Sequence, residues 1–194
     1  VSARHPGRCH SVIGNEPQAL DTLVRHLWTL GHRRIGWLGG NLGLGRHDAR
    51  HRAFVDALRA CGGRENERYR VVLKQADRSE GALAIRTLLT FARRRDFPTA
   101  FVAYNTLMAA GAVQALQVRG WGVPDDCSVV AADNSRLARA ESPPLTVAGT
   151  DPEKLGAAAG RLALEATGAS QAALQDLTLP SEFVVGESSG PPRG

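Results

Sequence analysis

The chain has 194 residues, of which 43% are hydrophobic, so it can bury an ordinary core as one domain or two small ones. It contains no apolar run of about 18 residues, and its start lacks the apolar core of a signal peptide, so neither a membrane span nor a secretory leader is expected. A net charge of +5 is compatible with binding to nucleic acid. The basic residues are scattered, however, and the densest run, residues 93–95, closes a predicted helix. This distribution disfavours contact with DNA.

Apolar periodicity predicts alternating strands and helices over the first two thirds of the chain. Five apolar runs are predicted as strands: residues 11–14, 35–38, 69–73, 99–103 and 128–132. The helices between them carry apolar stripes and are predicted to begin near Asn15, Asp48, Ser79 and Asn105. Strand-helix-strand units of this kind give a parallel sheet with helices on both faces, so the predicted fold class is α/β.

The pattern changes after residue 147. Asp151, Pro152 and Glu153 predict the start of another helix, and two short strands are expected at residues 177–179 and 183–185. The apolar stripe of this helix has little predicted sheet to cover it. The end of the chain, GESSGPPRG, is predicted to be disordered because it offers nothing apolar to bury.

Three polar residues follow different predicted strands. Asn105 and Asp133 come directly after two of them, and Arg50 lies beyond the loop after a third. Because the carboxyl ends of parallel strands meet at one edge, where ligands bind, we expect the three side chains to line one pocket. A carboxylate accepts from neighbouring hydroxyls while Arg and Asn donate, so the set suits a sugar or another polyol.

Arg46, four residues before Arg50, is a further candidate for this pocket. An alternative stays open for Asn105 and Asp133. Either residue could instead cap a helix or tie down a loop, since Asn and Asp side chains readily bond to nearby backbone groups.

Two motifs resemble sites of other chemistry. The loop at residues 39–45, GGNLGLG, matches neither GxxxxGK[ST] nor GxGxxG, and the next strand leads to Lys74 rather than to an acid, so a dinucleotide cofactor is not expected. His47 and His51 are spaced as in a zinc protease, but the acid between them is Asp48 rather than Glu and no third ligand is seen. We expect no metal.

The segment at residues 186–190, GESSG, fits the GxSxG pattern of a nucleophilic serine. That pattern requires a helix after the serine, and Pro191 follows instead, so no catalytic site is predicted. The three cysteines, Cys9, Cys61 and Cys127, are widely spaced without a CxxC pair. They predict neither a disulfide framework nor a zinc site, and a reduced cytoplasm is the simplest setting.

Three blocks carry a resemblance to a known family: PTAFVAYNTLMAAGAVQAL from Pro98, VPDDCSVVAADN from Val123, and SPPLT from Ser142. In sequence and spacing they resemble the effector-binding domain of the lactose/galactose repressor family of bacterial transcription regulators. The segments LWTLGHRRIGWLGG and LPSEFVVGESSGPP, together with Arg50 and Phe54, fit the same pattern. The resemblance covers nearly the whole chain.

The resemblance implies a fold of the periplasmic-binding-protein type I, in which the chain crosses three times between two similar subdomains. Residues 1–14 would be a remnant of the first subdomain and residues 15–147 a complete effector-binding subdomain. Residues 148–190 would return to the first subdomain, followed by a disordered tail at residues 191–194. The family's DNA-reading helix-turn-helix and about half of its effector domain would lie outside this sequence.

The resemblance also implies a function: sensing of a small-molecule effector, a sugar or related polyol, by a cytoplasmic homodimer. Ligand closure of the two subdomains would change how the dimer presents its DNA-binding domains. In the family, the positions of Arg50, Asn105 and Asp133 contact the effector. Thr106 stands where Asp is common, and Ala76 where some repressors stack an aromatic ring, so the identity of the effector stays open.

Two other functions are compatible with parts of the sequence. A periplasmic solute-binding protein of a sugar transporter would share the fold, and a signal peptide upstream would identify it. A nucleotide-dependent enzyme is disfavoured by the composition of the glycine-rich loop.

Overall fold

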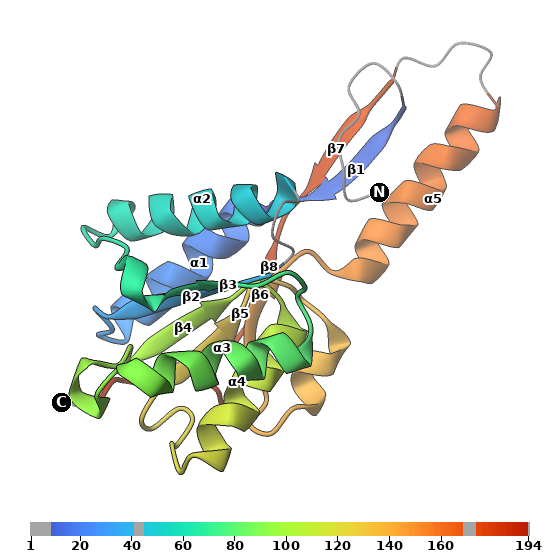
Figure 1. The fold of residues 1–194 in the computed structure, drawn as a ribbon. Helices are drawn as coiled ribbons and strands as arrows, with labels where there is room; N and C mark the ends of the chain where they lie inside the picture. Colours follow the sequence, from blue (N-terminus) through green and yellow to red (C-terminus); the bar gives the residue numbers. More distant parts are fainter. Residues whose placement is uncertain (1–8, 41–44, 169–173, 194) are drawn as a thin grey trace.

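A computed structural model describes residues 9–40, 45–168 and 174–193 of the chain. Its strands are β1 (Ser11–Gly14), β2 (Ile35–Gly39), β3 (Arg70–Val72), β4 (Ala100–Ala103), β5 (Ser128–Ala131), β6 (Thr146–Gly149), β7 (Asp176–Leu179) and β8 (Glu182–Val184). Its α-helices are α1 (Glu16–Thr29), α2 (Gly45–Ala60), α3 (Arg78–Phe91), α4 (Thr106–Val118) and α5 (Pro152–Gly168). Figure 1 shows a main α/β body from which β1, β7 and α5 extend as an arm.

Most strands belong to one sheet, in the order β3-β2-β4-β5-β6-β8. Neighbours in it run parallel except β8, which is antiparallel to β6. The α/β class and the parallel sheet are therefore confirmed. The first predicted strand does not join this sheet: β1 pairs in parallel with β7, so it opens the arm instead.

Strands β2, β4 and β5 are buried along their whole length because helices cover both faces of the sheet. Helices α1 and α2 pack together on one face, and α3 and α4 pack together on the other (Figure 1). The largest fully buried side chains of this core include Trp37, Phe54, Phe101 and Leu116.

Among helices α1 to α4, the predicted starts hold for α1 and α4 only, since α2 begins at Gly45 rather than near Asp48 and the cap of α3 also differs. Asn15 and Asn105 cap α1 and α4 as predicted. Ser79 does not cap α3, because the carboxylate of Asp77 accepts from the backbone N–H of Glu80 at 2.9 Å and the helix begins at Arg78. Helix α3 also ends before the arginine run: residues 93–95 lie beyond it, and Arg94–Asp96 form a 3₁₀ turn.

The expectation of a disordered tail is wrong as far as Arg193. Ser188 is fully buried; its hydroxyl donates to the carbonyl of Val129 at 2.5 Å and accepts from the N–H of Thr146 at 2.9 Å. Farther on, Arg193 pairs with Asp126 at 2.6 Å. Composition predicted disorder because the tail has no apolar core residue, but here polar groups tie it to the sheet.

A second, smaller apolar cluster holds the arm together. Val12 on β1 packs with Ala158 and Leu162 on α5, whereas Leu164 is 74% exposed. Leu155 and Ala159 pack against the same cluster, so most of the apolar stripe of α5 is covered, contrary to expectation, and the exposed Leu164 lies outside that stripe. From Glu182 onward the chain is back on the main sheet, so the third crossing lies between β7 and β8, the final two strands. The division into one complete and one partial subdomain stays a prediction.

Candidate functional site

Arg50 lies on the first half of α2, beyond the carboxyl end of β2, and is only 8% exposed. Its Nη1 donates to the carbonyl of Tyr104 at 2.6 Å, and its Nη2 pairs with Glu16 Oε1 at 3.0 Å. The guanidinium also lies over the Tyr104 ring, 4.4 Å from the centroid. Arg50 Nε is buried and has no hydrogen-bond partner among the described residues. A buried guanidinium N–H without a partner is costly, which favours an acceptor supplied by a ligand.

Asp133 follows β5 and reaches the start of α4. Its Oδ2 accepts from the backbone N–H of Thr106 at 3.1 Å, and its Oδ1 accepts from the Thr106 hydroxyl. A carboxylate at a helix N-terminus is stabilised by the helix dipole and by the free N–H groups there. Asp133 therefore anchors this corner of the sheet as well as facing the cavity described below.

Asn105 uses both ends of its amide. Its Oδ1 accepts from the N–H of Met108 at 2.9 Å as the cap of α4, and its Nδ2 donates to the carbonyl of Ala76 at 2.8 Å. These are the capping and loop-tying roles that the sequence left open. The residues on either side of Asn105 hold the other two candidates, since Tyr104 binds Arg50 and Thr106 binds Asp133.

A small cavity of about 100 Å³ brings Arg50 and Asp133 together. The other lining residues come from two of the three crossings between the main body and the arm and from neighbouring segments: Gly14, Asn15, Glu16, Ala19, Ala132, Asn134, Gly149, Thr150 and Leu155. Asn105 is not among them. Ligand pockets usually enclose about 300–1,000 Å³, so this cavity is smaller than an ordinary ligand site.

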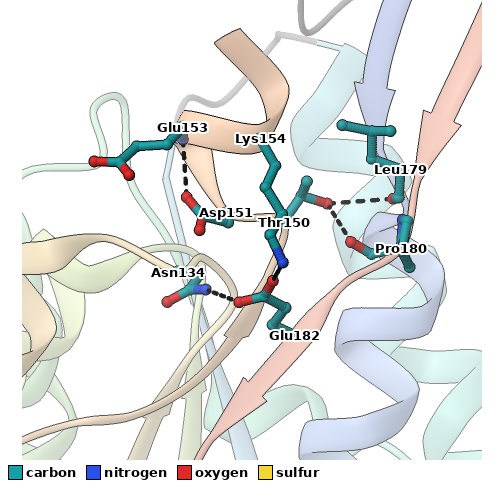
Figure 2. Close-up of polar contacts among 8 residues, drawn as sticks. All are labelled: Asn134, Thr150, Asp151, Glu153, Lys154, Leu179, Pro180 and Glu182. Carbon is teal, nitrogen blue, oxygen red and sulfur yellow. Dashed lines mark hydrogen bonds and ion pairs between the residues drawn. The ribbon is translucent and has the colours of Figure 1, made fainter. Parts of the chain in front are cut away.

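Polar contacts join the main body to the arm beside this cavity (Figure 2). Glu182 accepts from Asn134 Nδ2 at 3.3 Å and pairs with Lys154 Nζ at 2.5 Å. The hydroxyl of Thr150 donates to the carbonyls of Leu179 and Pro180 at 3.3 and 3.2 Å. Because Asn134 and Thr150 also line the cavity, a ligand there would touch the joint itself.

Sequence reasoning missed Glu16 and Asn134 as cavity residues. Glu16 lies in the first turn of α1, and its carboxylate neutralises Arg50 across 3.0 Å. Asn134 directly follows Asp133 at the end of a strand, so the strand-end rule that selected Asp133 could have selected it as well.

Other predicted features fall elsewhere. Arg46 belongs to α2, but its side chain and that of His47 lie outside the described residues, as do residues 41–44 of the glycine-rich loop. His51 contacts Glu65 at 2.7 Å, and no cluster of three or more His, Cys, Asp or Glu side chains suited to a metal occurs in the described part of the chain. In that same part, no helix is long and apolar enough to span a membrane.

Comparison with known proteins supplies the family. Residues 24–189 match the family described as periplasmic binding protein-like domain. The HTH-type transcriptional regulator DegA of Bacillus subtilis is 32% identical over 168 residues, which cover 87% of this chain and 48% of DegA. The chain thus spans about half the length of the curated relatives it matches.

Solved structures of LacI-family regulators resemble this chain as well. A LacI-family regulator from Sanguibacter keddieii has 30% sequence identity and a TM-score of 0.84, over 95% of this chain and 68% of that one. A sugar-binding transcriptional regulator of the LacI family from Escherichia coli, complexed with phosphate, has 27% identity and a TM-score of 0.80, over 98% of this chain and 67% of that one. With the profile match over most of its length, the chain belongs to the LacI family of transcriptional regulators, within the periplasmic binding protein-like domain.

Proposed function

We propose that this chain is the effector-sensing part of a bacterial transcription regulator and that it binds a sugar or related polyol. The observation that carries the proposal is Arg50, a buried cation whose Nε has no hydrogen-bond partner among the described residues, in one cavity with Asp133 at the carboxyl edge of the sheet. A guanidinium donates to a ring or hydroxyl oxygen while a carboxylate accepts from hydroxyls, so the pair complements adjacent hydroxyl groups.

Asn105 has a different role in this proposal from the one the sequence suggested. Both ends of its amide are engaged, so it positions the segment that contacts Arg50 and Asp133. Direct contact with the effector would require Asn105 Nδ2 to leave the carbonyl of Ala76. Arg46 stays a prediction.

The remaining walls of the site would come from a second subdomain, to which the arm of β1, β7 and α5 belongs. Ligand closure would act at the joint between main body and arm, where Asn134 and Thr150 line the cavity. DNA would be contacted through a helix-turn-helix domain outside this sequence, a reading supported by the description of the relative DegA as an HTH-type regulator. The setting would be cytoplasmic.

We further propose a homodimer. Helices α3 and α4 pack against each other and expose apolar side chains: Leu83, Phe91, Leu107 and Val118. A second copy that covered them would remove this apolar surface from water. The rival reading, a periplasmic solute-binding protein, shares the fold, but the relatives at 27–32% identity are transcription regulators.

The test uses the full-length protein that contains this chain. Thermal-shift screening against monosaccharides, disaccharides and sugar alcohols should yield at least one stabilising compound. The same compound should change the affinity for operator DNA in a fluorescence-anisotropy titration. A compound that binds without changing DNA affinity would contradict a sensing role and favour the solute-binding reading.

A further inference from the structure

A second and larger cavity lies at the opposite edge of the main sheet. Its volume is about 880 Å³, within the usual range for ligand sites, whereas the cavity beside Arg50 has about 100 Å³. Its lining residues Arg34, Thr99 and Asp126 precede β2, β4 and β5, whose amino ends meet at this edge because the strands are parallel. Figure 1 shows the C-terminus at this end of the body, away from the arm.

Arginines dominate the walls of this cavity: Arg33, Arg34, Arg94, Arg95 and Arg193. The carboxylates within ion-pair distance of them are Asp96, Asp125 and Asp126. Five guanidinium charges thus face three carboxylates among the described residues. Asp126 is shared by Arg94 and Arg193, at 2.8 and 2.6 Å, which shields its carboxylate from an incoming anion.

Arg33 and Arg34 keep their charge uncompensated. Arg33 Nη1 donates to the carbonyls of Trp28 and His32 at 2.8 and 2.9 Å, and its guanidinium lies 4.1 Å from the centroid of the Trp28 ring. Arg34 Nε donates to the carbonyl of Phe97 at 3.3 Å. Neither arginine forms an ion pair with a described carboxylate. Carbonyls and an aromatic face fix a guanidinium in place without neutralising it, so both remain available to an anion.

Aromatic and proline side chains form the apolar part of the cavity. The rings of Phe97 and Trp121 lie 4.7 Å apart, the guanidinium of Arg94 lies 4.5 Å from the centroid of the Trp121 ring, and Pro98 and Pro192 line the same space. An apolar wall beside guanidinium groups suits an anion that also carries an apolar or flat group. A concave site of this volume suits a small molecule better than duplex DNA, which needs an extended basic surface.

We propose that this cavity binds a small organic phosphate, with the phosphate groups on Arg33 and Arg34 and the organic part against the wall at Trp121. Guanidinium groups match phosphate oxygens with paired N–H donors, and two unmatched positive charges favour a multiply charged ligand. The site is separate from the proposed effector cavity, so either can fail without the other.

Isothermal titration calorimetry on the 194-residue chain tests the proposal, with ATP and inorganic tripolyphosphate as probes in low-salt buffer. The variant Arg33→Gln/Arg34→Gln removes both unpaired charges. The control Arg52→Gln/Arg86→Gln removes the same charge from exposed positions on α2 and α3. ATP affinity should fall about tenfold in the first variant and by less than about twofold in the control, since each partly exposed charge contributes a few-fold. Circular dichroism checks that both variants fold.

Several outcomes would overturn the proposal. Equal losses in the two double variants would mean attraction by net charge rather than by a site. If tripolyphosphate bound as tightly as ATP, the organic part of the ligand would add nothing to the affinity, which would contradict the proposed contact at Trp121. A short DNA duplex that binds more tightly than ATP, and depends on Arg33 and Arg34, would make this edge a nucleic-acid surface. If ATP did not bind even at millimolar concentration, the cavity would not be a binding site for organic phosphates.

Discussion

Ser188→Ala should destabilise the fold strongly, although the change removes one oxygen atom. Ser188 is fully buried, and its hydroxyl donates to the carbonyl of Val129 and accepts from the N–H of Thr146. Alanine leaves both backbone groups without this partner in a place water does not reach. An unsatisfied buried group costs about 1–3 kcal/mol, so the loss should be about 2–4 kcal/mol. For a chain of this size that corresponds to a fall in melting temperature of roughly 5–15 °C.

Differential scanning calorimetry or thermal circular dichroism measures the effect. Ser181→Ala is the matched control, because no hydrogen bond is found for the Ser181 hydroxyl among the described residues and the side chain is only partly buried. It should shift the melting temperature by less than about 2 °C. If Ser188→Ala behaved like this control, the tail would not be docked on the sheet, and the composition-based expectation of disorder would have been right.

Four further outcomes are expected. Burial lowers the pKa of His32 below its ordinary 6.5, so the free energy of unfolding should fall as pH drops below about 6.5, and a urea series should show a weaker pH dependence in His32→Gln. Burial raises the pKa of the Cys127 thiol, so a thiol reagent followed by mass spectrometry should label exposed Cys9 first and Cys127 only on unfolding. Gly111→Ala should cost about 1–3 kcal/mol in urea unfolding because its new methyl would meet the backbone of the neighbouring helix, whereas Gly160→Ala, in open space, should be neutral or stabilising. Calorimetry on this chain alone should find the effector bound at least about 100-fold more weakly than by the full-length protein, because the proposed second subdomain would supply the remaining walls.

The alternation of strands and helices was predictable because its signals are local. The strand β4 is a run of apolar residues buried on both faces, and the cap of α4 at Asn105 is chemistry within a few residues. Sheet pairing is not local. Ser11 lies opposite Asp176 in the arm, far along the chain, and nothing in the periodicity of either segment identifies the other.

The candidate site was predicted in part for the same reason. The strand-end rule correctly brought Arg50 and Asp133 to one edge of the sheet. It could not show that the amide of Asn105 is already used by the carbonyl of Ala76, because that depends on the path of a loop distant in sequence. The arginine-lined cavity was missed because Arg33 and Arg94 come from separate segments that only the fold brings together.

Effector affinity of Asp133→Asn in the full-length protein is the most direct test of the account. Asn keeps the shape of Asp133 and can still bond to Thr106, but it loses the charge proposed to accept the ligand hydroxyls. The dissociation constant for the effector should rise about 10- to 100-fold, while effector-free operator binding stays nearly unchanged. The melting temperature should fall by only about 1–4 °C, since the lost charge at the N-terminus of α4 costs about 0.3–1 kcal/mol. Asp56→Asn, which alters an exposed carboxylate, should change none of the three. Effector affinity that stays unchanged in Asp133→Asn, or that falls only together with stability and operator binding, would contradict a ligand-binding role for Asp133.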